Sequence, residues 1–289
     1  MKTWKEYYLE CKDIYNKETK LDNSSINVYD LKLQLNPFPK DQLYIDQINF
    51  IQNKLDILYQ DKTNYRNRYG LALGLNDIFI FEKEIKIILE NHLISYLEKN
   101  IFGCYIQCQN IMIYKTISEQ SEEVSSWLWH IDNNPKEQIK VMIYLNDVYD
   151  NGPFKYLSKD NKALKCIPET HRQDYNHWRP NNMYKQIAFE KFNKKWMGSR
   201  LPSDIIYRFT KTYNCKETEL KGPAGTTILF DNNIIHKGTI PSKKFRYAMI
   251  LQFQPSNKKL HPVLSKENTG NGWNTILFTQ NPESPIQQK

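Results

Sequence analysis

The sequence predicts a mainly β protein with helical additions, built as a β-sandwich or a jelly roll. Helical spacing of apolar residues is confined to roughly the first third of the 289 residues. After Gly103 the chain changes to short runs of β-branched and aromatic residues, and one long polar segment, 158–217, interrupts them. Helices first, followed by many short strands, is the element order of such layered β architectures.

Three helices are expected in the N-terminal segment, 1–102. Thr3 and Glu6 form a capping-box pattern ahead of the first helix. Asp41 can cap the second helix, and the third runs from about Phe79 to Asn100. The apolar stripes recur at helical spacing and consist of Trp4, Tyr7, Tyr8, Cys11, Ile14 and Tyr15, then Tyr44, Ile48, Ile51, Leu55, Leu58 and Tyr59, then Ile85, Ile88, Leu89, Leu93, Tyr96 and Leu97.

The segment 103–255 is expected to form the β core, with 158–217 inserted in it. Its predicted strands are Tyr105–Thr116, Ile139–Val148, Phe154–Leu157, Thr218–Lys221, Thr226–Phe230, Ile234–His236 and Arg246–Gln254. The insertion is expected to cover a pocket. The C-terminal extension, 256–289, is rich in Pro, Asn, Gly and Gln and is expected to be loop or loosely packed chain. Together these segments would form one composite domain.

Bulk composition narrows the classes of protein. The N-terminus lacks the apolar stretch of a signal peptide and no run approaches the length of a membrane span, so a cytoplasmic protein is expected. Five scattered cysteines without CxxC spacing indicate reduced thiols. The net charge of +8 is spread along the chain, which does not favour nucleic-acid binding and leaves an anionic small molecule as one option.

A histidine and an aspartate two residues apart, His130 and Asp132, can present both side chains on one side of an extended segment. His236 could complete a two-histidine, one-carboxylate site, the usual ligand set of non-haem Fe(II). Arg246 stands ten residues further on in an apolar strand. An arginine pointing inward from such a strand needs an anion, and its planar fork suits a carboxylate.

Each of these residues also has an ordinary structural interpretation. His130 could be a loop histidine paired with Asp132, His236 a turn histidine, and Arg246 an arginine at a sheet edge. The order of the elements favours the metal site. A strand with His-x-Asp, an Asn151-Gly152-Pro153 turn, an insertion, a glycine-rich turn, a second histidine and then an arginine follow one another along the chain.

From about Tyr105 to Pro255 the chain resembles the phytanoyl-CoA dioxygenase-like branch of the Fe(II)/2-oxoglutarate-dependent dioxygenases. The matching pieces are Trp129–Asp132, Lys140–Val148, Asn151–Phe154, Gly222–Asp231 and His236–Arg246. The resemblance implies a double-stranded β-helix (jelly roll, cupin-like), iron on His130, Asp132 and His236, and 2-oxoglutarate anchored by Arg246. It also implies a cosubstrate contact from Tyr144, and Tyr114 and Thr239 are further candidates on their position alone. The implied reaction is hydroxylation of an unactivated C–H of a small molecule with O2, releasing succinate and CO2.

Three features qualify this expectation. Phe154–Asp160 replaces the Pro-Gly-Ser-His turn that is common in the family, so the pocket entrance is expected to differ. Gly238 stands where a hydroxyl residue could contact the cosubstrate, and the presence of Asp132 favours hydroxylation or desaturation over halogenation. Trp127, Trp129 and Phe154 flank the metal motif and are candidate substrate contacts, although ordinary core packing explains the tryptophans equally well.

Two other functions fit the same sequence. One is a non-catalytic jelly-roll binding module, and the other is a dioxygenase that acts on nucleic acid or protein. The substrate and the oligomeric state do not follow from the sequence.

Overall fold

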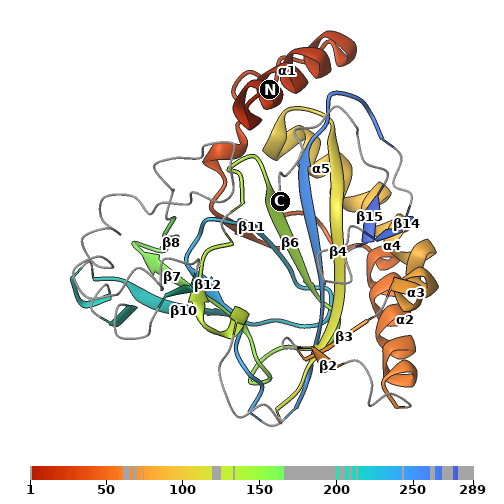
Figure 1. Cartoon of the computed structure of the whole chain (residues 1–289), viewed down its shortest axis with the longest axis vertical. Coiled ribbons are helices and arrows are strands. Elements are labelled where there is room, and N and C mark those ends of the chain that lie inside the picture. The colour runs from red at the N-terminus through yellow and green to blue at the C-terminus, as the bar shows by residue number, and fades with distance from the viewer. Residues whose placement is uncertain are drawn as a thin grey trace.

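Two antiparallel sheets make up the core, and the helices lie on the outer side of the larger sheet (Figure 1). The computed structural model describes residues 2–60, 66–67, 70–73, 75–118, 125–132, 134–165, 200–201, 206–207, 210–212, 214–242, 244–260, 264–268 and 276–278. Within these residues the larger sheet has nine strands and the smaller sheet has six. This arrangement confirms the predicted mainly β jelly roll with added helices.

The larger sheet is built on four long strands. These are β4 (Ile106–Thr116), β6 (Ile139–Tyr144), β11 (Thr227–Asp231) and β13 (Arg246–Pro255). They lie in the order β11-β6-β13-β4, so β13 is hydrogen-bonded on both sides. Nearly every residue of β13 is buried because one face meets the helices and the other faces the smaller sheet.

Alternation along these strands divides the core into two apolar clusters. Tyr247, Met249 and Leu251 join the outer cluster with the helices, whereas Ala248 belongs to the inner cluster between the sheets. The inner cluster also contains Tyr144, from the same face of the neighbouring strand. Side chains at even positions of β13 therefore point into the jelly roll, and Arg246 is one of them.

The smaller sheet consists of short strands in the order β10-β7-β12-β5-β9, with β8 paired to β7. Their bounds are β5 (Trp129–His130), β7 (Phe154–Lys159), β8 (Lys162–Ala163), β9 (Arg200–Leu201), β10 (Lys216–Leu220) and β12 (His236–Lys237). The two-residue strands β5 and β12 each carry one of the predicted metal-binding histidines at their pairing position.

The predicted helices are present. Helix α1 (Trp4–Thr19) begins with the complete Thr3 and Glu6 capping box, and α2 (Gln42–Leu58) is capped by the Asp41 carboxylate. The third helical segment follows α3 (Leu75–Ile78) and consists of η2 (Phe79–Phe81), α4 (Glu82–Ile88), the π-helical η3 (Leu89–Leu93), α5 (Ile94–Leu97) and the π-helical η4 (Glu98–Phe102). Gly103 ends it in the left-handed conformation with φ of 64°.

The segments outside the core also contribute strands that the sequence did not predict. The N-terminal segment adds not only helices and η1 (Val28–Asp30) but also three strands to the larger sheet: β1 (Leu33–Leu35), β2 (Arg66–Asn67) and β3 (Gly70–Ala72). The C-terminal extension contributes β14 (Leu264–Asn268) and β15 (Ile276–Phe278), and β15 pairs with β4. The edges of β11 and β4 that would otherwise be unpaired are covered by β1 and by β3 and β15, which protects them from pairing with other chains. The division into three segments stays a prediction.

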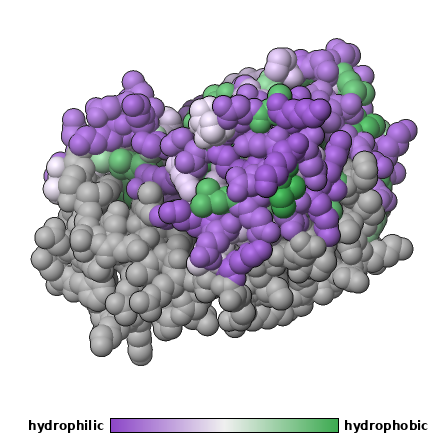
Figure 2. Space-filling model, turned by 90° about the horizontal axis from the view of Figure 1, so that it is seen from above, coloured by the Kyte–Doolittle hydropathy of each residue, from purple (hydrophilic) through white to green (hydrophobic). Residues whose placement is uncertain are grey.

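The described surface on the face shown in Figure 2 is mostly hydrophilic. Apolar residues are scattered among the hydrophilic ones. Single exposed apolar side chains of this kind are normal. In the part of the chain that the structure describes, no helix has both the length and the apolar composition required to cross a membrane.

Candidate metal and cosubstrate site

The pairing of β12 with β5 places His236 directly opposite His130. Their ring centroids are 4.2 Å apart, and both rings are buried. Residues directly opposite in an antiparallel pair have side chains on the same face of the sheet, so the two imidazoles enter the jelly roll together. A sequence separation of 106 residues is thus reduced to one cross-strand pair.

The orientation of each imidazole is fixed by the backbone. His130 Nδ1 is 2.7 Å from the carbonyl oxygen of Leu128, and His236 Nδ1 is 2.9 Å from that of Ile234. Because a carbonyl oxygen only accepts hydrogen bonds, both Nδ1 atoms carry the proton. Each Nε2 then presents its lone pair, which is the tautomer and the orientation that a metal ligand needs.

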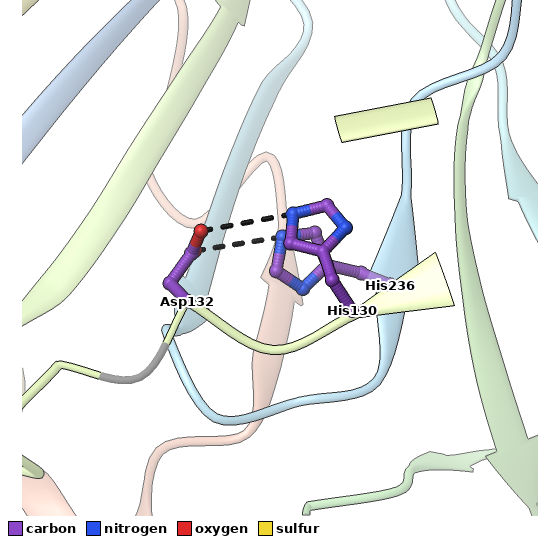
Figure 3. Close-up of side chains that lie close together, drawn as sticks. All are labelled: His130, Asp132 and His236. Carbon is purple, nitrogen blue, oxygen red and sulfur yellow. Dashed lines mark ion pairs between the residues drawn. The ribbon is translucent and has the colours of Figure 1, made fainter. Parts of the chain in front are cut away.

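Asp132 faces both of these nitrogen atoms. Its carboxylate oxygens lie 3.7 Å from His130 Nε2 and 3.5 Å from His236 Nε2, as the convergence of the three side chains in Figure 3 shows. The Asp132 amide donates to the carbonyl oxygen of Asn232 at 2.8 Å, which fixes the segment after β5 against the loop that leads to β12.

The three side chains could hold one metal ion. Their ligand atoms all lie within 4.8 Å of one another, and two atoms each about 2.1 Å from one ion can be at most ~4.2 Å apart. The separations of 3.5 and 3.7 Å fall within that limit. Within the described residues this is the group of histidine and carboxylate side chains that could hold a metal ion.

Lys140, on β6, adds a charge that the sequence analysis did not assign. Its ammonium lies 2.8 Å from Asp132 Oδ2, and both side chains are largely buried, at 19% and 13% exposed. Burial raises the pKa of the Asp132 carboxyl, but the Lys140 ammonium and the electrostatic effect of the two neighbouring imidazoles outweigh burial and hold that pKa well below its usual range. Asp132 is therefore an anion in the folded protein, as metal ligation requires.

The candidate substrate residues are all buried, and they occupy different places. Phe154 stacks on the His236 ring with centroids 5.3 Å apart, and Phe230 supports the same ring edge-on. Trp129 lies under the Lys237 ammonium at 5.8 Å. Trp127 lies at the arginine end, because a Cβ added to Gly238 would be 3.2 Å from Trp127 Cδ1 and 3.7 Å from Arg246 Nη2. The glycine leaves space beside the guanidinium.

Arg246 is 2% exposed and has no carboxylate partner among the described residues. Its Nη1 donates to the carbonyl oxygen of Gly152, and Nη2 approaches the hydroxyls of Tyr114 and Thr116 at 3.4 Å each. Its Nε is buried without a hydrogen-bond partner. A buried cation costs several kcal/mol unless an anion compensates it, so this arrangement is suited to a ligand carboxylate.

Tyr114 thus lies beside Arg246, with its ring 5.7 Å from the guanidinium carbon. The other two predicted cosubstrate contacts are engaged with the backbone. The Tyr144 hydroxyl donates to Leu220 at 2.8 Å and accepts from the Phe154 amide at 2.8 Å. The Thr239 hydroxyl donates to Pro153 at 2.7 Å. Their roles in cosubstrate binding stay predictions.

Lys140 and Thr116 were not singled out from the sequence. Both could have been found from the alternation of side chains along a strand. Lys140 lies on the same face of its strand as Tyr144, and Thr116 lies on the same face as Tyr114. The insertion 158–217 as a whole was expected to cover the pocket, and most of it, including residues 166–199, lies outside the described residues.

Comparisons with known proteins support this fold. No protein-family model matches the chain. L-proline trans-4-hydroxylase from Streptomyces griseoviridis is 24% identical over an alignment of 164 residues, and the match covers 52% of this chain. The match spans 56% of that enzyme, so the chain covers little more than half the length of the curated relative.

Solved structures share the architecture at low identity. The apoform of EctD from S. alaskensis has a TM-score of 0.51 at 14% identity, with 88% of this chain and 82% of that chain covered. EctD was also solved with 2-oxoglutarate and 5-hydroxyectoine. SnoK, a non-haem alpha-ketoglutarate-dependent carbocyclase of nogalamycin biosynthesis, has a TM-score of 0.50 at 11% identity, covering 88% and 90%. The chain therefore resembles the Fe(II)/2-oxoglutarate-dependent oxygenases and has their double-stranded β-helix fold.

Proposed function

We propose that the protein is a non-haem Fe(II)- and 2-oxoglutarate-dependent oxygenase that hydroxylates a small molecule. One observation carries the proposal. A buried His130, Asp132 and His236 set with converging ligand atoms lies in the same jelly roll as a buried arginine that has no counter-ion among the described residues. The first arrangement suits a divalent cation and the second suits a carboxylate, and 2-oxoglutarate can bridge them.

The residues have separate roles in this proposal. His130 and His236 hold iron through Nε2, and Asp132 holds it through a carboxylate oxygen. Arg246 binds the far carboxylate of 2-oxoglutarate, with the hydroxyls of Tyr114 and Thr116 beside it. When iron, 2-oxoglutarate and O2 are bound, they supply the oxidising power for C–H hydroxylation, with succinate and CO2 as products. The buried aromatic and apolar walls exclude water from this reaction.

A small anionic molecule is the substrate class that we propose. The site holds Arg246 and Lys140 as cations and Asp132 as the anion that pairs with Lys140, and bound Fe(II) would add two positive charges. Dianionic 2-oxoglutarate would leave an excess of one positive charge, which an anionic group of the substrate can balance. Trp127, Trp129 and Phe154 would form the apolar wall. Thr239 and Tyr144 are proposed as further cosubstrate contacts, and the location is proposed to be cytoplasmic.

A non-catalytic jelly-roll binding module remains the second candidate, because the ligand set alone does not require turnover. The two are separated by an assay for succinate, formed from 2-oxoglutarate with Fe(II) and O2. The assay is run across a panel of small amino acids and carboxylic acids that begins with L-proline. The enzyme predicts succinate, and a gain of one oxygen by one panel member in mass spectrometry. Absence of succinate, coupled or uncoupled, would leave the binding module.

A dioxygenase acting on nucleic acid or protein predicts stimulation by those polymers. If single-stranded nucleic acid or a denatured protein raises succinate formation while no small molecule does, the small-molecule proposal is wrong.

A further inference from the structure

The short segment Asn151–Phe154 contacts both ends of the proposed site. At one end the Gly152 carbonyl oxygen accepts a hydrogen bond from Arg246 Nη1. At the other end, two residues later, the Phe154 ring stacks on the ring of His236 at 5.3 Å with an interplanar angle of 19°. The segment therefore links the candidate cosubstrate anchor to a candidate metal ligand by a direct chain of three residues.

Asn151 fixes this segment to the strand that carries the arginine. Its Nδ2 donates to the carbonyl oxygens of Asp147 and Phe245, at 2.8 Å each. Its Oδ1 accepts from the Tyr149 amide at 2.9 Å. Phe245 immediately precedes Arg246, so one amide side chain holds the turn and the start of β13 together. The Phe245 carbonyl oxygen also accepts from Asn146 Nδ2 at 3.2 Å, whereas the bond that joins this carbonyl to the turn comes from Asn151. Aspartate or alanine at position 151 would supply no amide donor to either carbonyl oxygen.

Gly152 brings the segment close to the strand exit after His236. Its φ is 90°, in the left-handed region that favours glycine, and an added Cβ would be 2.5 Å from the carbonyl oxygen of Thr239. On the other side of the turn, the Phe154 amide donates to the Tyr144 hydroxyl at 2.8 Å. The segment is thus tied to β6, to β13 and to the residues after β12.

We propose that Asn151–Phe154 sets the spacing between the Arg246 guanidinium and His236, and thereby selects a 2-oxo diacid of five carbons. The inference rests on the proposed function. A diacid must reach from the metal to the arginine, so one methylene more or less displaces one of its carboxylates. Discrimination by one methylene in a fixed site is typically about 10- to 200-fold. Asn151 acts in this as a positioning residue.

The test compares three cosubstrates of different length, which are oxaloacetate, 2-oxoglutarate and 2-oxoadipate. Their dissociation constants are measured by anaerobic calorimetry on Fe(II)-loaded protein, and succinate release is measured separately for 2-oxoglutarate. The variants are Asn151→Ala and Asn151→Asp, which keeps the acceptor for Tyr149 but removes the amide donors. Asn36→Ala is the matched control, because it removes another inter-segment bond, from the Thr227 amide at 3.0 Å, away from the arginine.

The wild type is expected to bind 2-oxoglutarate at least ~10-fold tighter than either other acid. Both Asn151 variants are expected to reduce that preference by about 10-fold while Fe(II) affinity stays unchanged, and Asn36→Ala is expected to keep it even where its Tm falls equally. A preference that survives in both Asn151 variants, or a wild type without preference, overturns the inference and leaves the proposed function standing. If the wild type binds none of the three acids, both are wrong.

Discussion

Asp132 and Arg246 are the proposed metal-binding and cosubstrate-binding charges of the candidate site, and they differ in how they are compensated. Asp132 faces the Lys140 ammonium at 2.8 Å and two imidazoles within 3.7 Å. Arg246 contacts a carbonyl oxygen and two hydroxyls, and it has no carboxylate partner among the described residues. One charge is balanced within the chain and the other is not.

This difference indicates which parts of the site need a ligand for charge balance. A metal ion on Asp132 would share a carboxylate that Lys140 already stabilises, so the metal end is formed before the metal binds. The arginine end obtains its counter-ion only from a bound anion. Substitutions at the two ends should therefore have separable effects on metal binding, cosubstrate binding and stability.

The largest effect is expected from His236→Ala. It removes one of three metal ligands, so the affinity for Co(II), used as a stable substitute for Fe(II), should fall by more than about 100-fold in an anaerobic titration. His92→Ala is the control, because His92 is also a buried histidine but lies in the helical segment η3, where its ring stacks on Phe38. Equal metal affinity in wild type and His236→Ala would exclude this histidine as a ligand.

Arg246→Ala should act on the other end alone. Loss of the cation proposed to bind the far carboxylate of the cosubstrate should weaken 2-oxoglutarate binding by about 30-fold or more, with metal affinity unchanged. Arg246→Lys keeps the charge without the planar guanidinium, so its 2-oxoglutarate affinity should lie between those of the wild type and Arg246→Ala. The measurement is calorimetry on metal-loaded protein, and an unchanged 2-oxoglutarate affinity would show that the anchor lies elsewhere.

Lys140→Met tests the compensation of Asp132 by measuring the stability of the protein with and without metal. Without its cation, buried Asp132 would be poorly compensated, and the metal-free protein should lose about 2 kcal/mol in urea unfolding. Saturating Co(II) should remove most of that difference, because the metal then balances Asp132. Lys155→Met, which removes a pair with the more exposed Glu219, should change stability little. An equal loss for Lys140→Met with and without metal would contradict the account.

The smallest effect concerns a carboxyl that lacks such compensation. Burial raises the pKa of Glu98 to about 7, despite a hydrogen bond from Ile106 and the charges of Lys259 and Lys99. The folded protein then holds a proton that the unfolded chain releases near its ordinary pKa of 4.5. Stability from this group is present at low pH and declines as pH rises from about 4.5 to 7. A pKa shift from 4.5 to about 7 corresponds in full to about 3 kcal/mol. Because Glu98 is partly exposed and solvent screens it, Glu98→Gln should flatten the unfolding free energy over that window by roughly 1 kcal/mol.

The candidate site could be predicted from the sequence where its residues are tied to local patterns. His130 and Asp132 are two residues apart on a strand end, and His236 and Arg246 follow a glycine-rich turn in a fixed order. Lys140 was harder to assign, because its relation to Asp132 arises from the folding of β6 against the segment after β5. A lysine in a strand has no distinctive pattern without that pairing.

The fold shows the same limit. Long strands such as β4 and β13 were predicted from their own composition, since runs of 11 and 10 residues that are rich in apolar and aromatic side chains leave little ambiguity. The three residues of β1 and those of β15 are too short for such a signal, and they become strands because β11 and β4 offer them partners. Sequence patterns therefore predicted the centre of the sheet better than its edges.

The most direct test of the proposed function is an anaerobic titration of 2-oxoglutarate into Fe(II)-loaded protein, followed in the visible spectrum. The wild type is predicted to develop the weak charge-transfer band of a 2-oxo acid chelated to iron, and the band should saturate with one equivalent. Arg246→Ala should require about 30-fold or more cosubstrate for the same band. Absence of the band in Fe(II)-loaded wild type would contradict the proposed function.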